Sequence, residues 1–110
     1  MEIDQEAINH VEVLYLKGRL DAVSAKQLKE KVASLGQEKG PKLVIDMAGV
    51  DFIDSSGLGA LISSLRTVSK LGGDIKISGL QHQARSIFEL TRLDRVFRIY
   101  DDSMAAAKSF

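Results

Sequence analysis

Two hydroxyl side chains and a carboxylate stand next to one another in the sequence, at Asp54, Ser55 and Ser56. The apolar run before them, 42–47, predicts a strand, and the run after them, 60–71, predicts a helix. The three polar side chains are therefore expected where a strand ends and a helix begins. Unpaired backbone N–H groups and the positive end of the helix dipole face outward at such a position. A side chain at this position can be recognised by a partner, charged or modified without disturbing the core. We therefore expect the function of the chain to depend on these residues.

A serine hydrolase is the first class of protein to test against this segment. A nucleophile elbow has glycine two positions before the serine and two positions after it. Ser55 has only the second of these glycines, and Ser56 has neither. The chain has two histidines, His10 near a predicted hairpin turn and His82 near a predicted helix start, and both fit exposed polar positions. Since no general base is placed, we expect that the chain is not an enzyme and has no catalytic residue.

Nucleotide and metal sites have little support in the sequence. The G-x-G at 57–59 lacks the third glycine of the dinucleotide fingerprint, and the chain has no G-x-x-x-x-G-K-[ST]. Asp46, Asp51 and Asp54 bracket one predicted loop, where they could hold a hard cation or serve turns and helix caps. Turn formation and capping are the favoured explanation, so we expect no metal and no cofactor.

The remaining chemistry is modification of a serine by another protein. A phosphoryl group adds roughly −1.5 to −2 charges and three acceptor oxygens. The helix dipole tolerates an anion at the N-terminus, whereas the carboxylate of Asp54 would repel it and make it unfavourable in an interface. Such a site can keep the fold and still switch off a binding surface. The residues alone leave an alternative open, in which Ser55 and Ser56 only cap the helix.

Composition restricts the class of protein. The chain has 110 residues, enough for one domain with its own core, and we expect a single domain over 1–110. Fifteen basic residues balance fifteen acidic ones, so charge gives no reason to expect direct binding of nucleic acid. There is no cysteine, no basic and apolar leader, and no apolar run near the ~20 residues that span a bilayer. These features predict a cytoplasmic protein without membrane insertion.

Strand-like and helix-like segments alternate along the chain. A hairpin is predicted over 3–20, with its turn near 8–10 and a second strand that is apolar on both faces. In the helix that follows, Ser24 and Gln27 fit a capping box, and Gly36 can end it. Further strands are predicted at 42–47, 74–78 and 96–99, and further helices over 60–71, over 84–91 and after a cap at Asp101, Asp102 or Ser103. This alternation predicts an α/β fold with helices packed against a parallel or mixed sheet.

The motifs resemble those of a known family. The hexamer D-S-S-G-L-G at 54–59 is similar to the central signature of the anti-sigma factor antagonists, the small single-domain members of the STAS family. The tetrapeptide G-R-L-D at 18–21 resembles the family's G-x-L-D at the exit of an early strand, and the segments 43–47, 87–94 and 97–101 resemble its later elements in the same order. The resemblance implies one STAS domain, with a mixed, mainly parallel sheet of about four to five strands packed by about four α-helices.

The resemblance also implies a mechanism. The unphosphorylated antagonist binds an anti-sigma factor of the GHKL serine-kinase type and frees a sigma factor. The kinase phosphorylates the first serine after the signature aspartate, here Ser55, and a PP2C-type phosphatase resets the switch. ATP and Mg²⁺ belong to the partner, so this chain needs no cofactor.

The family signature carries over to further residues of this chain. Asp21 would lie close to the phosphorylated serine, and Gly57 would let the partner's backbone or an ATP phosphate approach closely. The small face of Gly59, Ala60 and Ser63 would serve a similar approach. The full set implied to shape the phosphorylation site or bind the partner is Asp21, Asp54, Ser56, Gly57, Leu58 and Gly59.

Two points qualify the match. Arg92 stands where the family often has glycine, and a positive φ there would cost arginine on the order of 1 kcal/mol and change how the third helix ends. Stand-alone STAS domains also resemble soluble subunits of lipid-transport ABC complexes and parts of stress-signalling scaffolds. In that alternative, the serine segment is a contact surface without phosphorylation.

Overall fold

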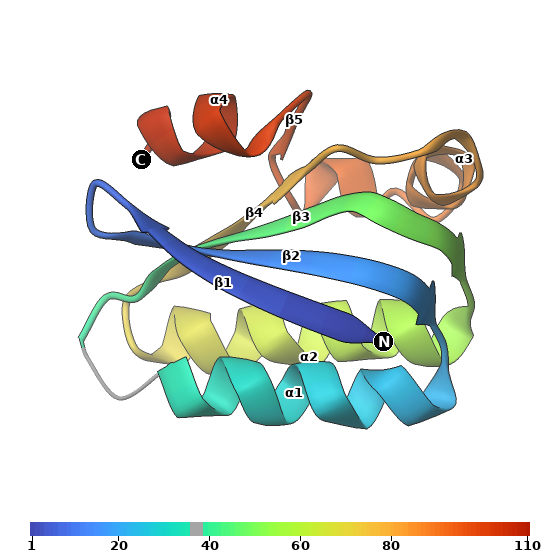
Figure 1. The fold of residues 1–110 in the computed structure, drawn as a ribbon, viewed down its shortest axis with the longest axis horizontal. Coiled ribbons are helices and arrows are strands. Elements are labelled where there is room, and N and C mark those ends of the chain that lie inside the picture. The colour runs from blue at the N-terminus through green and yellow to red at the C-terminus, as the bar shows by residue number, and fades with distance from the viewer. Residues whose placement is uncertain (36–38) are drawn as a thin grey trace.

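One five-stranded sheet forms the centre of the molecule (Figure 1). The computed structural model describes residues 1–35 and 39–110. The strands lie in sequence order, and all neighbours are parallel except the antiparallel first pair. They are β1 (Glu2–Ile8), β2 (Val11–Leu20), β3 (Lys42–Ile53), β4 (Asp74–Ser78) and β5 (Ile99–Tyr100). The predicted α/β class with a mixed, mainly parallel sheet is confirmed.

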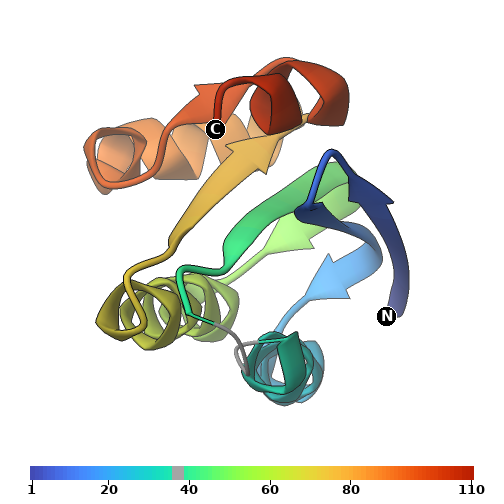
Figure 2. The same cartoon turned by 90° about the vertical axis from the view of Figure 1, so that its left-hand side faces the viewer.

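Helices cover both faces of the sheet (Figure 2). On one side lie α1 (Ala22–Leu35) and α2 (Ser55–Lys70), and on the other lie α3 (His82–Leu90) and α4 (Ser103–Lys108). The larger apolar core includes Leu14, Leu16, Ile45 and Phe88, all nearly inaccessible to solvent. A smaller cluster joins the sheet to α4 through Val11, Val13, Val44, Ala106 and Ala107. Because β2 contributes Leu14 to one core and Val13 to the other, the prediction that it is apolar on both faces is confirmed.

The first helix begins earlier than its predicted capping box. Asp21 precedes α1, and its carboxylate Oδ1 accepts from the backbone N–H groups of Val23 and Ser24, both at 3.2 Å. The hydroxyl of Ser24 accepts in return from the backbone N–H of Asp21 at 2.8 Å. The reciprocal cap therefore joins Asp21 to Ser24, and the predicted pairing of Ser24 with Gln27 is wrong. The predicted end at Gly36 lies outside the described residues.

The central strand is six residues longer than the predicted 42–47. From Gly49 to Ile53 it pairs in parallel with Lys17 to Leu20 of β2, with register shifts on the way. Gly49 allows this close pairing, since a Cβ there would lie 2.7 Å from the carbonyl oxygen of Leu16. Asp51 consequently lies in a strand and not in the predicted loop.

The helix boundaries and the last strand also differ from the predictions. The second helix begins at Ser55, five residues before the predicted 60, so both serines lie in its first turn. The last strand is Ile99–Tyr100 and not 96–99, because residues Leu93–Arg95 form a short 3-10 helix, η1, that buries Leu93 and Phe97. Arg92, just before it, has φ 61°, so the left-handed conformation considered for this position is present. Of the three predicted caps for the last helix, Asp102 is the one used, accepting from the N–H of Ala105 at 2.8 Å.

Candidate functional site

The carboxyl ends of β2 and β3 bring the predicted site residues together. Leu20 pairs with Ile53, and each strand is followed at once by an aspartate and then by a helix. The backbone N–H of Asp54 donates to the carbonyl of Leu20 at 3.3 Å, which joins the two strand ends. Figure 1 shows both strands ending on the right, where α1 and α2 begin. We call residues 19–24 and 52–59 the β2–β3 edge.

Asp54, and not a serine, caps α2. Its backbone is extended (φ −117°), and its carboxylate Oδ1 accepts from the backbone N–H of Gly57 at 3.0 Å. Ser55 and Ser56 are the first two residues of the helix and are exposed. Over the described residues, neither hydroxyl forms a hydrogen bond with another protein group. The alternative in which these serines serve only as caps is therefore wrong, and both residues are exposed.

Asp21 caps α1 beside this position. The pKa of Asp21 lies below its usual 3.8, mainly because the backbone N–H of Ser24 donates to the carboxylate. Partial desolvation raises the pKa, but by less than this hydrogen bond lowers it. The Ser24 hydroxyl, the N–H of Val23 and the nearby Arg19 lower it further. The Ser24 hydroxyl also donates to the carbonyl of Arg19 at 2.6 Å, so the turn between β2 and α1 is closed on both sides. Asp21 is thus a fixed, ionised carboxylate near Asp54.

The two glycines of the hexamer have different surroundings. Gly57 is buried, and a Cβ on it would lie 2.3 Å from the carbonyl oxygen of Leu20 and 2.8 Å from the Leu20 Cγ. It therefore lets α2 pack closely on β2 within the chain. The expected role of Gly57 in admitting a partner's backbone stays a prediction. Gly59 is exposed, and a Cβ there would meet nothing within 4 Å. Leu58 is half-buried against the core, and Ala60 is buried, so the small face expected around Gly59 is open only in part.

Two glutamines that the sequence did not single out support the end of β3. β4 stops at Ser78, so β3 has no strand neighbour on that side beyond Asp46. The Gln83 side chain takes the place of a strand there, because its Oε1 accepts from the N–H of Ile53 and its Nε2 donates to the Ile53 carbonyl, both at 3.2 Å. Gln81 donates to the carbonyl of Ala48 in the same way. No sequence signal marked these side chains, since their role exists only because β3 is longer than predicted.

The three aspartates considered for a cation serve different purposes. Asp46 is buried and accepts from the Ser78 hydroxyl at 2.7 Å and from the N–H of Ala48 at 3.1 Å. Asp51 is exposed on β3, and Asp54 caps α2. Across residues 1–35 and 39–110, no three His, Cys, Asp or Glu side chains are grouped as a metal site would need.

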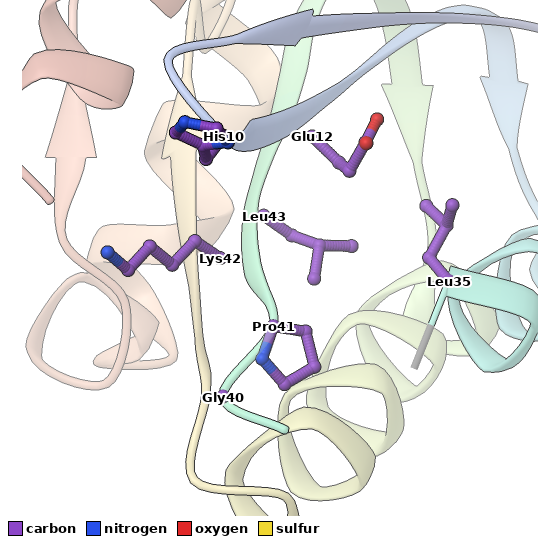
Figure 3. A pocket seen from close by; sticks show the side chains of 7 residues that line it. All are labelled: His10, Glu12, Leu35, Gly40, Pro41, Lys42 and Leu43. Carbon is purple, nitrogen blue, oxygen red and sulfur yellow. The ribbon is translucent and has the colours of Figure 1, made fainter. Parts of the chain in front are cut away.

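The two histidines lie on different elements. His82 is the exposed first residue of α3, and His10 lies in the turn between β1 and β2 with φ 66°. His10 also lines a pocket of about 220 Å³ with Glu12, Leu35, Gly40, Pro41, Lys42 and Leu43 (Figure 3). This pocket lies at the starts of β2 and β3, at the opposite end of these strands from the β2–β3 edge. No helix within the described ranges is long and apolar enough to cross a membrane.

Comparison with known proteins gives a consistent set of similarities. A model of the STAS domain matches residues 2–106. The anti-sigma-B factor antagonist of Bacillus subtilis is 33% identical over 84 residues, which cover 76% of each chain. That of Listeria monocytogenes is 26% identical over 99 residues, covering 90% of this chain and 86% of the relative. The crystal structure of an anti-sigma factor antagonist from Mycobacterium paratuberculosis has a TM-score of 0.86 at 27% identity, covering 98% of this chain and 92% of the other.

Proposed function

Because this chain belongs to the STAS-domain family of anti-sigma factor antagonists, we propose that it binds an anti-sigma factor and thereby frees a sigma factor. The β2–β3 edge is the proposed binding surface. It presents exposed Ser55, Ser56 and Gly59 beside two fixed carboxylates, those of Asp21 and Asp54. In this proposal the chain is a cytoplasmic binding protein with no catalysis of its own.

The proposed switch is phosphorylation of Ser55 by the anti-sigma factor, acting as a GHKL-type serine kinase. One observation carries this assignment: Ser55 is the exposed first residue of α2, while the cap of that helix is supplied by Asp54. The hydroxyl can therefore accept a phosphoryl group without loss of the cap, and the helix dipole tolerates the added anion. A PP2C-type phosphatase would restore the hydroxyl.

Phosphorylation is expected to end binding through charge. A phosphate adds roughly −1.5 to −2 charges next to two carboxylates that already lie at this edge, those of Asp21 and Asp54. A partner surface that is complementary to the unmodified edge would then meet additional negative charge. Binding would also require removal of water from the phosphate, which is energetically costly. The fold is expected to persist, since no core contact involves the Ser55 side chain, which is exposed.

The test is mass spectrometry after incubation with Mg-ATP and each anti-sigma factor kinase encoded in the same genome. A single phosphate is expected on Ser55, absent in Ser55→Ala and retained in Ser56→Ala. Ser55→Asp and Ser55→Glu should keep the thermal unfolding profile and lose kinase binding, whereas Ser55→Ala should bind and resist phosphorylation. If no kinase modifies the chain while one of them still binds it, the edge is a constitutive docking surface and the switch is refuted.

A further inference from the structure

Arg19 is the one residue of the β2–β3 edge that carries a positive charge, and its side chain is held in a defined place. Its guanidinium carbon lies 4.0 Å from the centre of the Phe52 ring, on the neighbouring strand. Its Nε lies 4.0 Å from Oδ2 of Asp21. Stacking on an aromatic ring fixes the plane of a guanidinium group and lowers the entropy that it loses on binding.

The contacts of Arg19 leave most of its hydrogen-bonding capacity unused. The side chain is 62% exposed, and within the described parts of the chain no hydrogen bond of its guanidinium group is present. The Asp21 contact is too long for a hydrogen bond, and the other carboxylate oxygen of Asp21 is engaged by α1. The Arg19 guanidinium group therefore has one face against the Phe52 ring and its N–H donors open to solvent. Such a planar set of donors suits a carboxylate or a phosphate.

Resting on the proposed function, we infer that Arg19, held by Phe52, binds an acidic side chain of the anti-sigma factor and sets partner choice at this edge. The surrounding charges make this contact selective. Asp21 and Asp54 supply two carboxylates to the same edge, and Asp51 lies next to it on β3, so an acidic group of the partner is repelled everywhere except at Arg19. A partner with a different charge pattern is rejected by like charges, which gives specificity beyond raw affinity.

The test measures binding of Arg19 variants to the purified kinase that phosphorylates Ser55 in the experiment above. Arg19→Gln is expected to weaken binding about three- to tenfold, and Arg19→Glu about 30-fold or more, with faster dissociation and a weaker salt dependence of association. Phe52→Leu keeps the charge but removes the ring, and should weaken binding about threefold. Arg95→Glu is the matched control, since it reverses an exposed arginine in η1, on the other side of β3 and β4 from β2.

A charge exchange then identifies the acidic partner residue. Changing one acidic interface residue of the kinase to lysine should restore binding of Arg19→Glu and weaken binding of the unchanged chain. Thermal unfolding of each variant separates loss of binding from loss of fold. This control matters for Arg19→Glu, because the new carboxylate would lie near that of Asp21 and could destabilise the fold. If Arg19→Gln binds within twofold of the unchanged chain with the same salt dependence, the inference is wrong, even where Ser55 is phosphorylated.

A second measurement applies if no kinase binds and the proposed function fails. The Nε–Hε signal of Arg19 is followed by NMR during titration with sodium acetate, against sodium chloride at equal ionic strength. A larger shift for Arg19 than for Arg95, reduced to the Arg95 level in Phe52→Leu, supports a prepared carboxylate site. Equal shifts for both arginines overturn it.

Discussion

Gly57 offers a sharp test of how the β2–β3 edge is built, because Gly59, two residues away, is its natural control. Both glycines lie in the first turns of α2 and belong to the same hexamer. A Cβ on Gly57 would lie 2.3 Å from the Leu20 carbonyl oxygen, 2.8 Å from the Leu20 Cγ and 3.0 Å from the Ile53 Cγ1. A Cβ on Gly59 would meet nothing within 4 Å. Substitution by alanine should therefore have opposite effects at the two positions.

The magnitudes follow from two opposing terms. Alanine in a helix is favoured over glycine by roughly 0.5–1 kcal/mol at either position. At Gly57, overpacking costs about 1–3 kcal/mol, and the upper end applies because the nearest atom is a backbone carbonyl that also accepts from Asp54. Gly57→Ala should then lose about 2 kcal/mol of unfolding free energy and lower Tm by about 8 °C. Gly59→Ala should gain up to about 1 kcal/mol and raise Tm by about 4 °C.

Thermal and urea unfolding of the two purified variants, beside the unchanged chain, measures both effects. Gly57→Ala should also slow phosphorylation of Ser55, because pushing α2 outward breaks the link between Asp54 and Leu20. A Gly57→Ala protein as stable as Gly59→Ala would refute the account of Gly57 as a close-packing residue. The role of Gly57 in admitting a partner would then have to be considered again.

Four further substitutions, at three residues, test the helix caps and the strained residue. Asp54→Ala should lower the unfolding free energy by about 1 kcal/mol through loss of the α2 cap, whereas Asp54→Asn should keep most of it, as measured by urea unfolding. The lowered pKa of Asp21 means that its ionised form stabilises the fold fully above pH 3.8 and that this stabilisation is lost as pH falls through the lower folded-state pKa. Asp21→Asn should therefore have a lower free energy of unfolding than the unchanged chain at pH 7, as measured with urea, and the two values should approach each other below pH 3.8. A difference in unfolding free energy that persists or widens in acid would contradict this. Arg92→Gly should raise Tm by a few degrees, since it relieves a positive φ worth about 1 kcal/mol; a lowered Tm would show that the Arg92 side chain stabilises the turn.

The sequence predicted well whatever depends on local pattern. The hairpin, the alternation of strands with helices and the polar residues at a strand end all follow from hydrophobic period and turn chemistry, which act over a few residues. The convergence of Asp21 with Asp54 followed only from the family resemblance, because these residues are 33 positions apart and meet through the parallel pairing of Leu20 with Ile53.

The failures share a physical cause, which is that tertiary contacts override local signals. Ser24 and Gln27 fit a capping box, but the end of β2 places Asp21 where it caps the helix three residues earlier. The segment after 47 lacks a clear strand pattern, and it is extended because β2 pairs with it and Gly49 permits close approach. The sequence gives no sign that Gly57 packs against Leu20, because that contact depends on where β2 ends in space.

β3 extends well beyond the strand that pairs with it on one side. β4 pairs with β3 only from Lys42 to Asp46, and beyond that point β3 relies on β2 and on the Gln81 and Gln83 side chains. Regions with fewer backbone partners open locally at a lower free energy than the whole domain unfolds. The backbone hydrogen bonds at the end of β3 are therefore expected to open at a lower free energy than those of the five-stranded centre. On the proposed function, a kinase must move Ser55 into its active site. The free energy that opposes this movement is then that of local opening of the β3 extension, and not the free energy of unfolding of the whole domain.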